Sequence, residues 1–542
     1  MSEPATTAPA ARPARILRSA AVVGAMTAVS RVAGVVREQL MAYAFGTSLA
    51  KSAFNVAFQL PNLFRRLFGE GALASAFVPV YTDVLEKEGP EEANRLFARV
   101  AGLLVAVLSI ISAIGILIAL ALQHWWFTPD SRWAMILPLL RIMLPYALLI
   151  CLAALVMGAL NAMHDFATSA LTPVFLNLVM IIAIIDFCPP CMSDPLRCFK
   201  MIAWSVLVAG VVQVAVQLPP LVKRGVSLRL LFDWRNEPHL KRVLNLMAPT
   251  MIGNSVFQIN VFVDSILAMW AAEWAPAALL YAENIAYLPL GLIGNAFGTV
   301  LLPTFSKQAT DEDHEALAHT IEHALCSSLI ITAPAAVALT VLALPVVEIL
   351  YLWPGGKFME QDAIWTMRAL AGLAPGLIFF SMQKVLTPAF YALKDARTPL
   401  RVGLWGVGMN FTLNVIFVLT WPQGWKHVGL VVSTVLVSAI NSVSLALAMR
   451  QRIGSPRWSA VVPTLIGVTL AMVGMGLAAW IGHNGFVAIF HRLTHIEKIV
   501  QLAALTAAGI LSSAVYLLIV RLLCRNELHD VLSQLLRRRK KA

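Results

Sequence analysis

Ionisable side chains stand inside stretches of this sequence that otherwise have the composition of membrane-buried helices. In the first half these residues and their polar neighbours are Ser30, Arg31, Arg37, Asn62, Arg65, Arg66 and Glu70. A charge costs several kcal/mol in lipid, so such groups are expected to face a protein interior or an aqueous cavity. Four arginines outnumber the glutamates, and the planar guanidinium fork suits phosphate oxygens. The pattern therefore favours an anionic, phosphate-bearing substrate. The alternative is that these residues lie at helix ends and extend to the interface.

Spacing adds detail to this cationic set. Arg31 and Arg37 are six residues apart and do not align on an ideal helix, so a local break near Gly34 would be needed to bring them together. Arg66 and Glu70 are four residues apart and can pair on one helical face.

The second half carries a different polar set within predicted spans. It comprises Asp264, Glu283, Asn284, Arg368 and Lys384, together with Asn410 and Asn414. If the helices pack as expected, Asp264 faces Asn410 and Asn414. One carboxylate with two amide oxygens could hold Na⁺ or carry a proton. An ordinary hydrogen-bonded interior cluster explains the same residues equally well.

Composition identifies the setting of these residues. The chain has 542 residues, 59% of them hydrophobic and 13% charged, and the apolar residues form blocks long enough to cross a hydrocarbon core of about 30 Å. These blocks are strongly hydrophobic and do not alternate between apolar and polar residues, which favours transmembrane helices over a β-barrel. We expect an all-α polytopic membrane protein of about fourteen transmembrane helices. The expected spans are 17–46, 53–84, 99–123, 134–162, 167–188, 201–222, 241–270, 276–305, 318–350, 363–391, 398–421, 428–450, 458–482 and 499–524.

The basic residues set the expected orientation. The net charge is +12, and loops on the side of the two termini hold about three times as many Lys and Arg residues as the opposite loops, which places both termini in the cytoplasm. No basic patch with interleaved aromatic residues indicates nucleic acid. No cleavable signal peptide is evident before the first helix.

A weak internal duplication divides the chain. ALNAMHDFATSALTP, containing Asp165, resembles AFYALKDARTP, containing Asp395, and AFVPVYTD resembles VLLPTFSK. Six helices separate the members of each pair, which predicts two six-helix lobes related by a pseudo-twofold axis, with the substrate path between them. The expected domains are a disordered tail (1–16), an N-terminal lobe (17–225), a C-terminal lobe (226–452), two further helices (453–526) and a basic tail (527–542).

Three of the six cysteines cluster in a predicted outer loop, CPPCMSDPLRC, as Cys188, Cys191 and Cys198. An oxidising side permits a disulfide there, and the CPPC spacing also leaves a redox or metal role open. Without a fourth ligand nearby, a structural disulfide or free thiols are favoured.

The motifs that carry these charges also resemble a known family. SRVAGVVREQLMAYAFG, SAFNVAFQLPNLFRRLFGEGALASAFVPVYTD, YAENIAYLPLGLIGNAFGTVLLPTFSK and KVLTPAFYALKDARTP are similar to signatures of the MurJ/MviN family. The resemblance implies the fold of the multidrug/oligosaccharidyl-lipid/polysaccharide exporter class, with the last two helices forming a groove for a lipid tail. It also implies a bacterial inner-membrane flippase for lipid II, the undecaprenyl-diphosphate-linked peptidoglycan precursor. Positions matching the family's cavity are Ser30, Arg31, Arg37, Asn62, Arg65 and Glu70.

Two positions depart from the family pattern. Ser52 replaces the usual acidic residue, and Asn284 replaces a basic residue of the cationic substrate site. These departures leave the diphosphate-binding role to Arg31, Arg37, Arg66 and Lys384. We expect a monomer that uses no cofactor beyond possible Na⁺ or H⁺ coupling.

Three other functions were weighed. A flippase for another undecaprenyl-linked glycan is opposed only by the N-terminal motif, and a multidrug or cation antiporter would favour acidic and aromatic cavity residues. A membrane glycosyltransferase would need an acidic metal motif or a nucleophile–base pair, neither of which we find.

Overall fold

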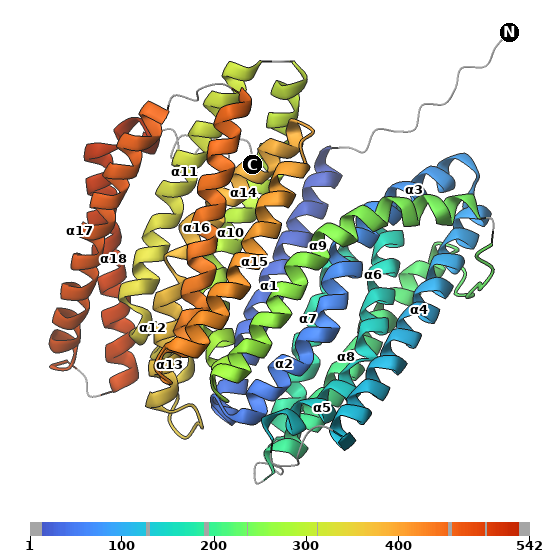
Figure 1. Cartoon of the computed structure of the whole chain (residues 1–542), viewed down its shortest axis with the longest axis horizontal. Coiled ribbons are helices and arrows are strands. Elements are labelled where there is room, and N and C mark those ends of the chain that lie inside the picture. Colours follow the sequence, from blue (N-terminus) through green and yellow to red (C-terminus); the bar gives the residue numbers. More distant parts are fainter. Residues whose placement is uncertain are drawn as a thin grey trace. The chain divides into compact units, whose positions relative to one another are not determined.

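Helices account for all regular secondary structure in the described part of the chain. The computed structural model describes residues 13–125, 131–188, 194–235, 237–311, 313–453, 458–493 and 496–529. The first elements in chain order are α1 (Pro13–Phe45), α2 (Leu49–Phe64), the π-helix η1 (Arg65–Ala72), α3 (Leu73–Lys87), α4 (Pro90–Trp125), α5 (Arg132–Met143), α6 (Tyr146–Ala162), α7 (Phe166–Phe187) and α8 (Pro195–Lys223). They are followed by α9 (Pro238–Ala271), α10 (Ala275–Thr310), α11 (His314–Val341), α12 (Ala343–Tyr351), α13 (Glu360–Leu373), α14 (Gly376–Ala392), α15 (Arg397–Thr420), α16 (Lys426–Ile453), α17 (Trp458–Phe490) and α18 (Glu497–Leu523) (Figure 1).

Each expected span coincides with one helix or with two or three successive helices. Within the described residues, 9 helices are long and apolar enough to cross a membrane, and the bent pair α13–α14 makes up to 10. The four expected spans outside this set are α1, α2–η1–α3, α9 and α10. They carry most of the charged and polar residues selected from the sequence, and parts of them lie outside the described residues. The prediction of a polytopic, all-α membrane protein is confirmed.

Several spans predicted as single helices are interrupted. The span 134–162 divides before Pro145 and the span 363–391 divides before Gly376, where α13 and α14 meet at 42° next to Pro375. The span 318–350 divides at Leu342, three residues before Pro345. Proline lacks an amide donor and disfavours helical geometry in the preceding residue, and a proline lies at or near each of these breaks.

The duplicated loops have the same local structure. In the first, His164 adopts a left-handed φ of 61°. Asp165 then caps α7 by accepting hydrogen bonds from the Thr168 amide (3.5 Å) and hydroxyl (3.3 Å). The Arg224 guanidinium at the end of α8 donates to the same Asp165 carboxylate at 3.1 Å. The loop therefore ties the start of α7 to the end of α8.

The second loop repeats this arrangement residue for residue. Lys394 has a φ of 58°, and Asp395 accepts from the Thr398 amide at 3.1 Å and the Thr398 hydroxyl at 2.7 Å. Arg452, at the end of α16, donates to Asp395 at 2.8 Å. The Thr398 hydroxyl bond, helped by Arg452 and opposed by burial, lowers the pKa of Asp395 below its ordinary value of 3.8. The match of Asp165 with Asp395 thus extends from sequence to hydrogen bonds.

The chain folds as two compact units. One contains Met1–Ala44 and Ala53–Phe262, and the other contains Phe45–Ser52 and Val263–Ala542. The turn between α1 and α2 accordingly packs within the second unit. There the Tyr281 hydroxyl donates to the Gly46 carbonyl at 3.0 Å, Thr47 donates to Asp362, and the Lys51 ammonium lies 5.4 Å from the Tyr281 ring centre.

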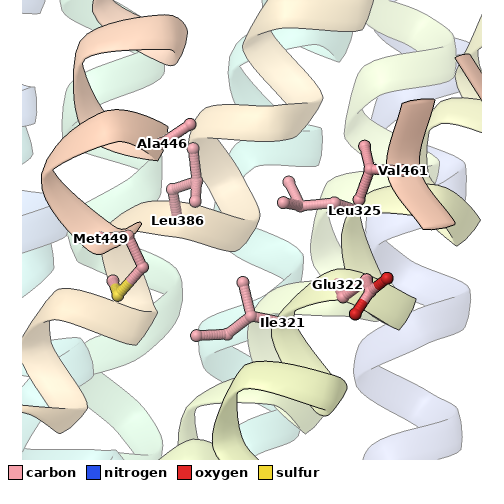
Figure 2. A pocket seen from close by; sticks show the side chains of 7 residues that line it. All are labelled: Ile321, Glu322, Leu325, Leu386, Ala446, Met449 and Val461. Atoms are coloured by element: carbon pink, nitrogen blue, oxygen red, sulfur yellow. The ribbon is translucent and has the colours of Figure 1, made fainter. Parts of the chain in front are cut away.

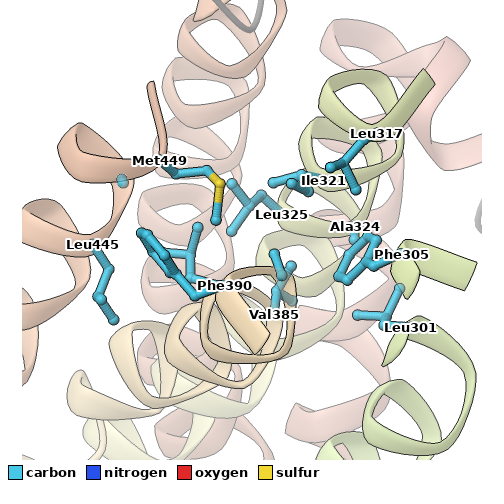
Figure 3. Close-up of a cluster of buried hydrophobic side chains, with 13 residues drawn as sticks. Leu301, Phe305, Leu317, Ile321, Ala324, Leu325, Val385, Phe390, Leu445 and Met449 are labelled. Atoms are coloured by element: carbon cyan, nitrogen blue, oxygen red, sulfur yellow. The ribbon is translucent and has the colours of Figure 1, made fainter. Parts of the chain in front are cut away.

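Apolar packing holds the second unit together in two places. One cluster joins α10, α11, α14 and α16 around Phe305 and Phe390, both fully buried (Figure 3). The other docks the α17–α18 hairpin on α11, where the Tyr516 hydroxyl donates to the Ile330 carbonyl at 2.8 Å. The hairpin is also tied by Lys498, which donates to the Glu348 carbonyl at 2.5 Å.

Candidate functional site

Arg37 and Ser30 are joined through one residue of α7. The Asn177 side chain accepts from the Arg37 guanidinium at 3.0 Å and donates to the Ser30 carbonyl at 3.0 Å. Arg37 also donates twice to Glu38, at 2.6 Å and 3.2 Å, and Glu38 is only 5% exposed. The charge of Arg37 is therefore partly balanced, and its guanidinium is held in a fixed place against α7.

Arg31 differs from Arg37. It is half-buried on α1, and it forms no hydrogen bond or ion pair with any residue in the described ranges. α1 is helical from Pro13 to Phe45, without the break near Gly34 that would be needed to bring the two arginines together. Gly34 instead faces Asn177, whose amide would lie 3.7 Å from an added Cβ. The two arginines thus leave α1 in different directions, one held by protein partners and the other available to a ligand.

The cationic end of α2 lies in a π-helix. A π-helix is rare, occurs frequently at functional sites, and changes the direction in which successive side chains point. Arg65 begins η1 and donates to Asn62 at 2.8 Å, while Arg66 donates to Gln258 of α9 at 3.2 Å. The Glu70 side chain lies outside the described residues, so its pairing with Arg66 remains a prediction. The sequence predicted one span over residues 53–84 and did not identify the π-helix.

In the second unit, the polar residues of α9 and α15 meet as predicted. Asn414 donates to Asp264 at 2.7 Å and to the Asn410 side-chain carbonyl at 3.0 Å. Ser433 of α16 donates to the Asn414 side-chain oxygen, and Asn410 donates to Thr434 at 3.4 Å. One carboxylate, two amides and two hydroxyls therefore converge within a single hydrogen-bonded network, which offers oxygen atoms to a small hard cation.

Lys384 and Asn284 lie on α14 and α10, helices that pack against each other in the second unit. Both side chains are half-buried. The Asn284 amide nitrogen is buried without a hydrogen-bond partner among the described residues. The position where the family pattern has a basic residue thus presents an unsatisfied donor.

Sequence reasoning missed three residues of interest. Asn177 and Gln258 became visible only as partners of the arginines. Arg141 on α5 is a half-buried charge inside a predicted span, and it forms no hydrogen bond or ion pair with another described residue. Like the arginines of α1, it is an ionisable residue inside an apolar predicted span, so the sequence could have identified it in the same way.

Two of the three cysteines in CPPCMSDPLRC lie within the described residues. Cys198 is disulfide-bonded, whereas Cys188 is a buried free thiol. Cys191 lies outside the described residues. Of the two outcomes that the sequence left open, Cys198 shows the disulfide and Cys188 shows the free thiol. Among the described residues, no group of three or more His, Cys, Asp or Glu side chains could hold a metal ion.

A small crevice in the second unit lies away from these polar sites. It is lined by Ile321, Glu322, Leu325, Leu386, Ala446, Met449 and Val461 (Figure 2). Six of its seven residues are apolar, so it offers packing surface rather than ligand-binding groups.

Comparison with known proteins identifies the family. A family model described as lipid II flippase MurJ matches residues 41–523. The chain belongs to the MurJ family of lipid II flippases. The resemblance inferred from the sequence motifs is confirmed.

Individual relatives agree with this assignment. A probable lipid II flippase MurJ of Vibrio cholerae serotype O1 is 34% identical over 443 residues, covering 80% of this chain and 82% of that protein. One from Rhizobium tropici is 35% identical over 470 residues, covering 85% of this chain and 86% of that protein. A lipid II flippase MurJ of Burkholderia cenocepacia is 32% identical over 471 residues, covering 85% of this chain and 89% of the relative.

Solved structures agree at the level of fold. A lipid II flippase MurJ in an inward closed conformation has a TM-score of 0.72 at 22% identity, covering 93% of this chain and 99% of that one. An inward-facing multidrug resistance MATE family transporter of the MOP superfamily has a TM-score of 0.62 at 16% identity, covering 81% of this chain and 99% of that one. The fold class predicted from the sequence is confirmed.

Proposed function

We propose that this protein is a lipid II flippase of the bacterial inner membrane, which moves the undecaprenyl-diphosphate-linked precursor from the cytoplasmic to the periplasmic leaflet by alternating access. Membership of the MurJ family carries this proposal. The protein acts as a transporter rather than an enzyme, works as a monomer, binds no nucleic acid, and has both termini in the cytoplasm.

The arginines on α1 and η1 bind the diphosphate of the substrate. Moving its charge unassisted through a low-dielectric bilayer is prohibitive, and fixed cations lower that barrier. Arg31 supports this role because it is half-buried and has no partner among the described residues. Arg37, held by Asn177 and Glu38, supplies a second guanidinium in a fixed position.

Asn284 of the second unit is a separate candidate contact for the substrate. Because its amide nitrogen is buried and unsatisfied among the described residues, it is suited to donating to a substrate oxygen. Asn284→Arg restores the charge typical of the family, so we expect it to be tolerated and to bind the substrate more tightly.

The α17–α18 hairpin binds the polyprenyl tail. Both helices carry exposed leucine and isoleucine side chains, among them Leu470, Leu477, Ile510 and Leu517. The opposite face of the hairpin is docked on α11. An apolar face beside the bundle suits an apolar chain that remains in lipid while the headgroup crosses.

Asp264, Asn410 and Asn414 form a coupling site for Na⁺ or H⁺. Their oxygens, with those of Ser433 and Thr434, fit a hard monovalent cation. In this structure the Asn414 amide nitrogen donates to Asp264. Cation binding would require that amide to turn its oxygen inward, so the network has two alternative arrangements.

Complementation tests the proposed function. A strain depleted of its own flippase is supplied with this protein, and the leaflet distribution of lipid II is measured by accessibility to an external probe. Restored growth with lipid II reaching the outer leaflet is the expected result. Lipid II that stays in the cytoplasmic leaflet at normal protein abundance would exclude this substrate and favour another undecaprenyl-linked glycan.

A further inference from the structure

The connection between α8 and α9 has an unusual distribution of apolar side chains. Residues 226–235, here called the strap, form neither a helix nor a strand. Leu228, Leu230, Phe232 and Trp234 are 49%, 43%, 57% and 37% exposed. These four side chains occupy every second position of the strap, and together they form an exposed apolar row.

The strap is fixed against one face of α4. The Leu231 amide donates to the Ala98 carbonyl at 3.1 Å, and the Asn94 side chain donates to the Gly225 carbonyl at 2.8 Å. A Cβ on Gly102 would lie 2.1 Å from the Leu231 carbonyl oxygen, so only glycine permits this approach. The contacts recur every four residues along α4, and they hold the strap backbone against that face of the helix.

The contacts on α4 also indicate the depth of the strap. Arg99 forms an ion pair with Glu237 at 2.7 Å, directly after the strap. Beyond Arg99, residues 103–122 of α4 contain no charge. The strap therefore lies where α4 passes from charged to wholly apolar sequence, which is the level of lipid headgroups.

Basic residues accompany the apolar row. Lys223, Arg229 and Arg235 are exposed, and none forms an ion pair with a residue of the described chain. Asp233 is the only acidic residue between positions 223 and 235. The Phe232 and Trp234 rings stand 6.0 Å apart, edge to face. Aromatic and aliphatic side chains flanked by unpaired cations are typical of segments that lie in an anionic membrane interface.

We propose that the strap is an interfacial anchor that inserts Leu228, Leu230, Phe232 and Trp234 at the headgroup–acyl boundary of the cytoplasmic leaflet and binds anionic phospholipid headgroups through Arg229 and Arg235. A row of four apolar residues at headgroup depth fits a lipid surface better than a protein partner, which would have to approach within the membrane interface. The anchor fixes the connection between α8 and α9 to the membrane. This proposal is independent of the identity of the transported substrate.

The experiment places a nitroxide on the strap of the full-length protein with Phe232→Cys. The protein is reconstituted in nanodiscs of phosphatidylcholine alone or of an equal mixture with phosphatidylglycerol. Spectra of the identically treated protein without this substitution are subtracted. Accessibility to oxygen, which dissolves in lipid, and to a water-soluble nickel chelate gives the ratio of inserted to aqueous label. We expect an inserted label whose ratio rises with phosphatidylglycerol.

Charge variants test the headgroup contact. A basic residue near an anionic surface changes the binding constant for that surface about five-fold. The Arg229→Gln/Arg235→Gln variant should therefore reduce the gain in membrane insertion that phosphatidylglycerol causes roughly 25-fold. The charge-preserving Arg229→Lys/Arg235→Lys variant should retain it, which excludes misfolding as the cause. Arg401→Gln/Arg450→Gln removes two exposed arginines from the ends of α15 and α16 and should leave the effect unchanged.

Three results would overturn the proposal. They are a label that is open to the nickel chelate in both lipid compositions, insertion that is unaffected by loss of the two arginines, and protection that appears only after addition of cytosolic extract. The last result would assign the strap to a protein partner.

Discussion

Replacing Arg31 and Arg37 separately should affect stability very differently, although both carry the same charge on the same helix. Arg37 contacts Glu38 at 2.6 Å, and the Glu38 side chain is 7% exposed. Arg37→Ala removes the Arg37 cation from a carboxylate that stays buried. Breaking a buried pair costs about 3–5 kcal/mol, and the 19% exposure of the Arg37 side chain favours the lower end, about 3 kcal/mol.

Arg31→Ala removes no partner within the described residues, so its effect on the unfolding free energy should stay within about 0.5 kcal/mol. The measurement is reversible unfolding in mixed micelles for the parent, both alanine variants, Glu38→Gln and Arg37→Ala/Glu38→Gln. Because the double variant removes both charges of the pair, it should be more stable than Arg37→Ala, with a coupling energy above about 1 kcal/mol.

Transport should separate from stability in the same variants. Arg31→Ala should fail to complement a flippase-depleted strain while reaching full abundance, and Arg31→Lys should be less impaired because it retains charge without the planar fork. If Arg37→Ala unfolds like the parent, or if Glu38→Gln does not compensate it, the ion-pair reasoning is refuted. If both alanine variants support normal growth at equal abundance, the diphosphate site must be moved to Lys384 on α14.

Three further predictions concern other parts of the protein. Because the Thr398 hydroxyl lowers the pKa of Asp395, this carboxylate should stabilise the protein above pH 3.8 and lose its contribution as the pH falls through the lowered pKa. The difference in melting temperature between the parent and Asp395→Asn should therefore be present at pH 7 and disappear in strong acid. Gly102→Ala should destabilise by about 1–3 kcal/mol because its Cβ would overlap a strap carbonyl, whereas Gly403→Ala, with nothing within 4 Å, should be neutral or slightly stabilising in thermal melts. Asp264→Asn should abolish any Na⁺-dependent or pH-dependent rise in melting temperature, and a dependence that persists in this variant would place the coupling ion elsewhere.

The sequence predicted the residues that build both candidate sites better than it predicted their partners. Asp264 could be placed opposite Asn414 because polar residues within two apolar spans have few alternatives to pairing with each other. The partner of Arg37 could not be found in this way, since Asn177 is one of several polar residues in its half of the chain. Arg31 and Arg37 do not align on the helix, as their spacing of six residues indicates, and α1 has no break at Gly34 that would bring them together. Glycine there faces the Asn177 side chain instead.

Helix interruptions were predictable in part. Pro145 and Pro375 mark two breaks, yet Pro173, Pro249 and Pro334 stand within helices that continue through them. A proline removes one backbone donor, and whether the helix ends there depends on packing that local sequence does not specify. The duplicated aspartates, Asp165 and Asp395, led from sequence to structure most directly. A helix-capping aspartate at a fixed spacing from a threonine defines its hydrogen bonds locally.

The turn at residues 45–52 has a consequence for biogenesis. Its partner Asp362 lies 315 residues further along the chain. At a synthesis rate of about 5–20 residues per second, Thr47 waits roughly 15–60 s for that carboxylate. During this interval Lys51, which is 1% exposed in the finished fold, has neither the Tyr281 ring nor the surrounding helices to cover it. The α1–α2 hairpin must therefore enter the membrane with its tip unsupported, and the ribosome releases nearly two thirds of the chain before that tip reaches its final environment.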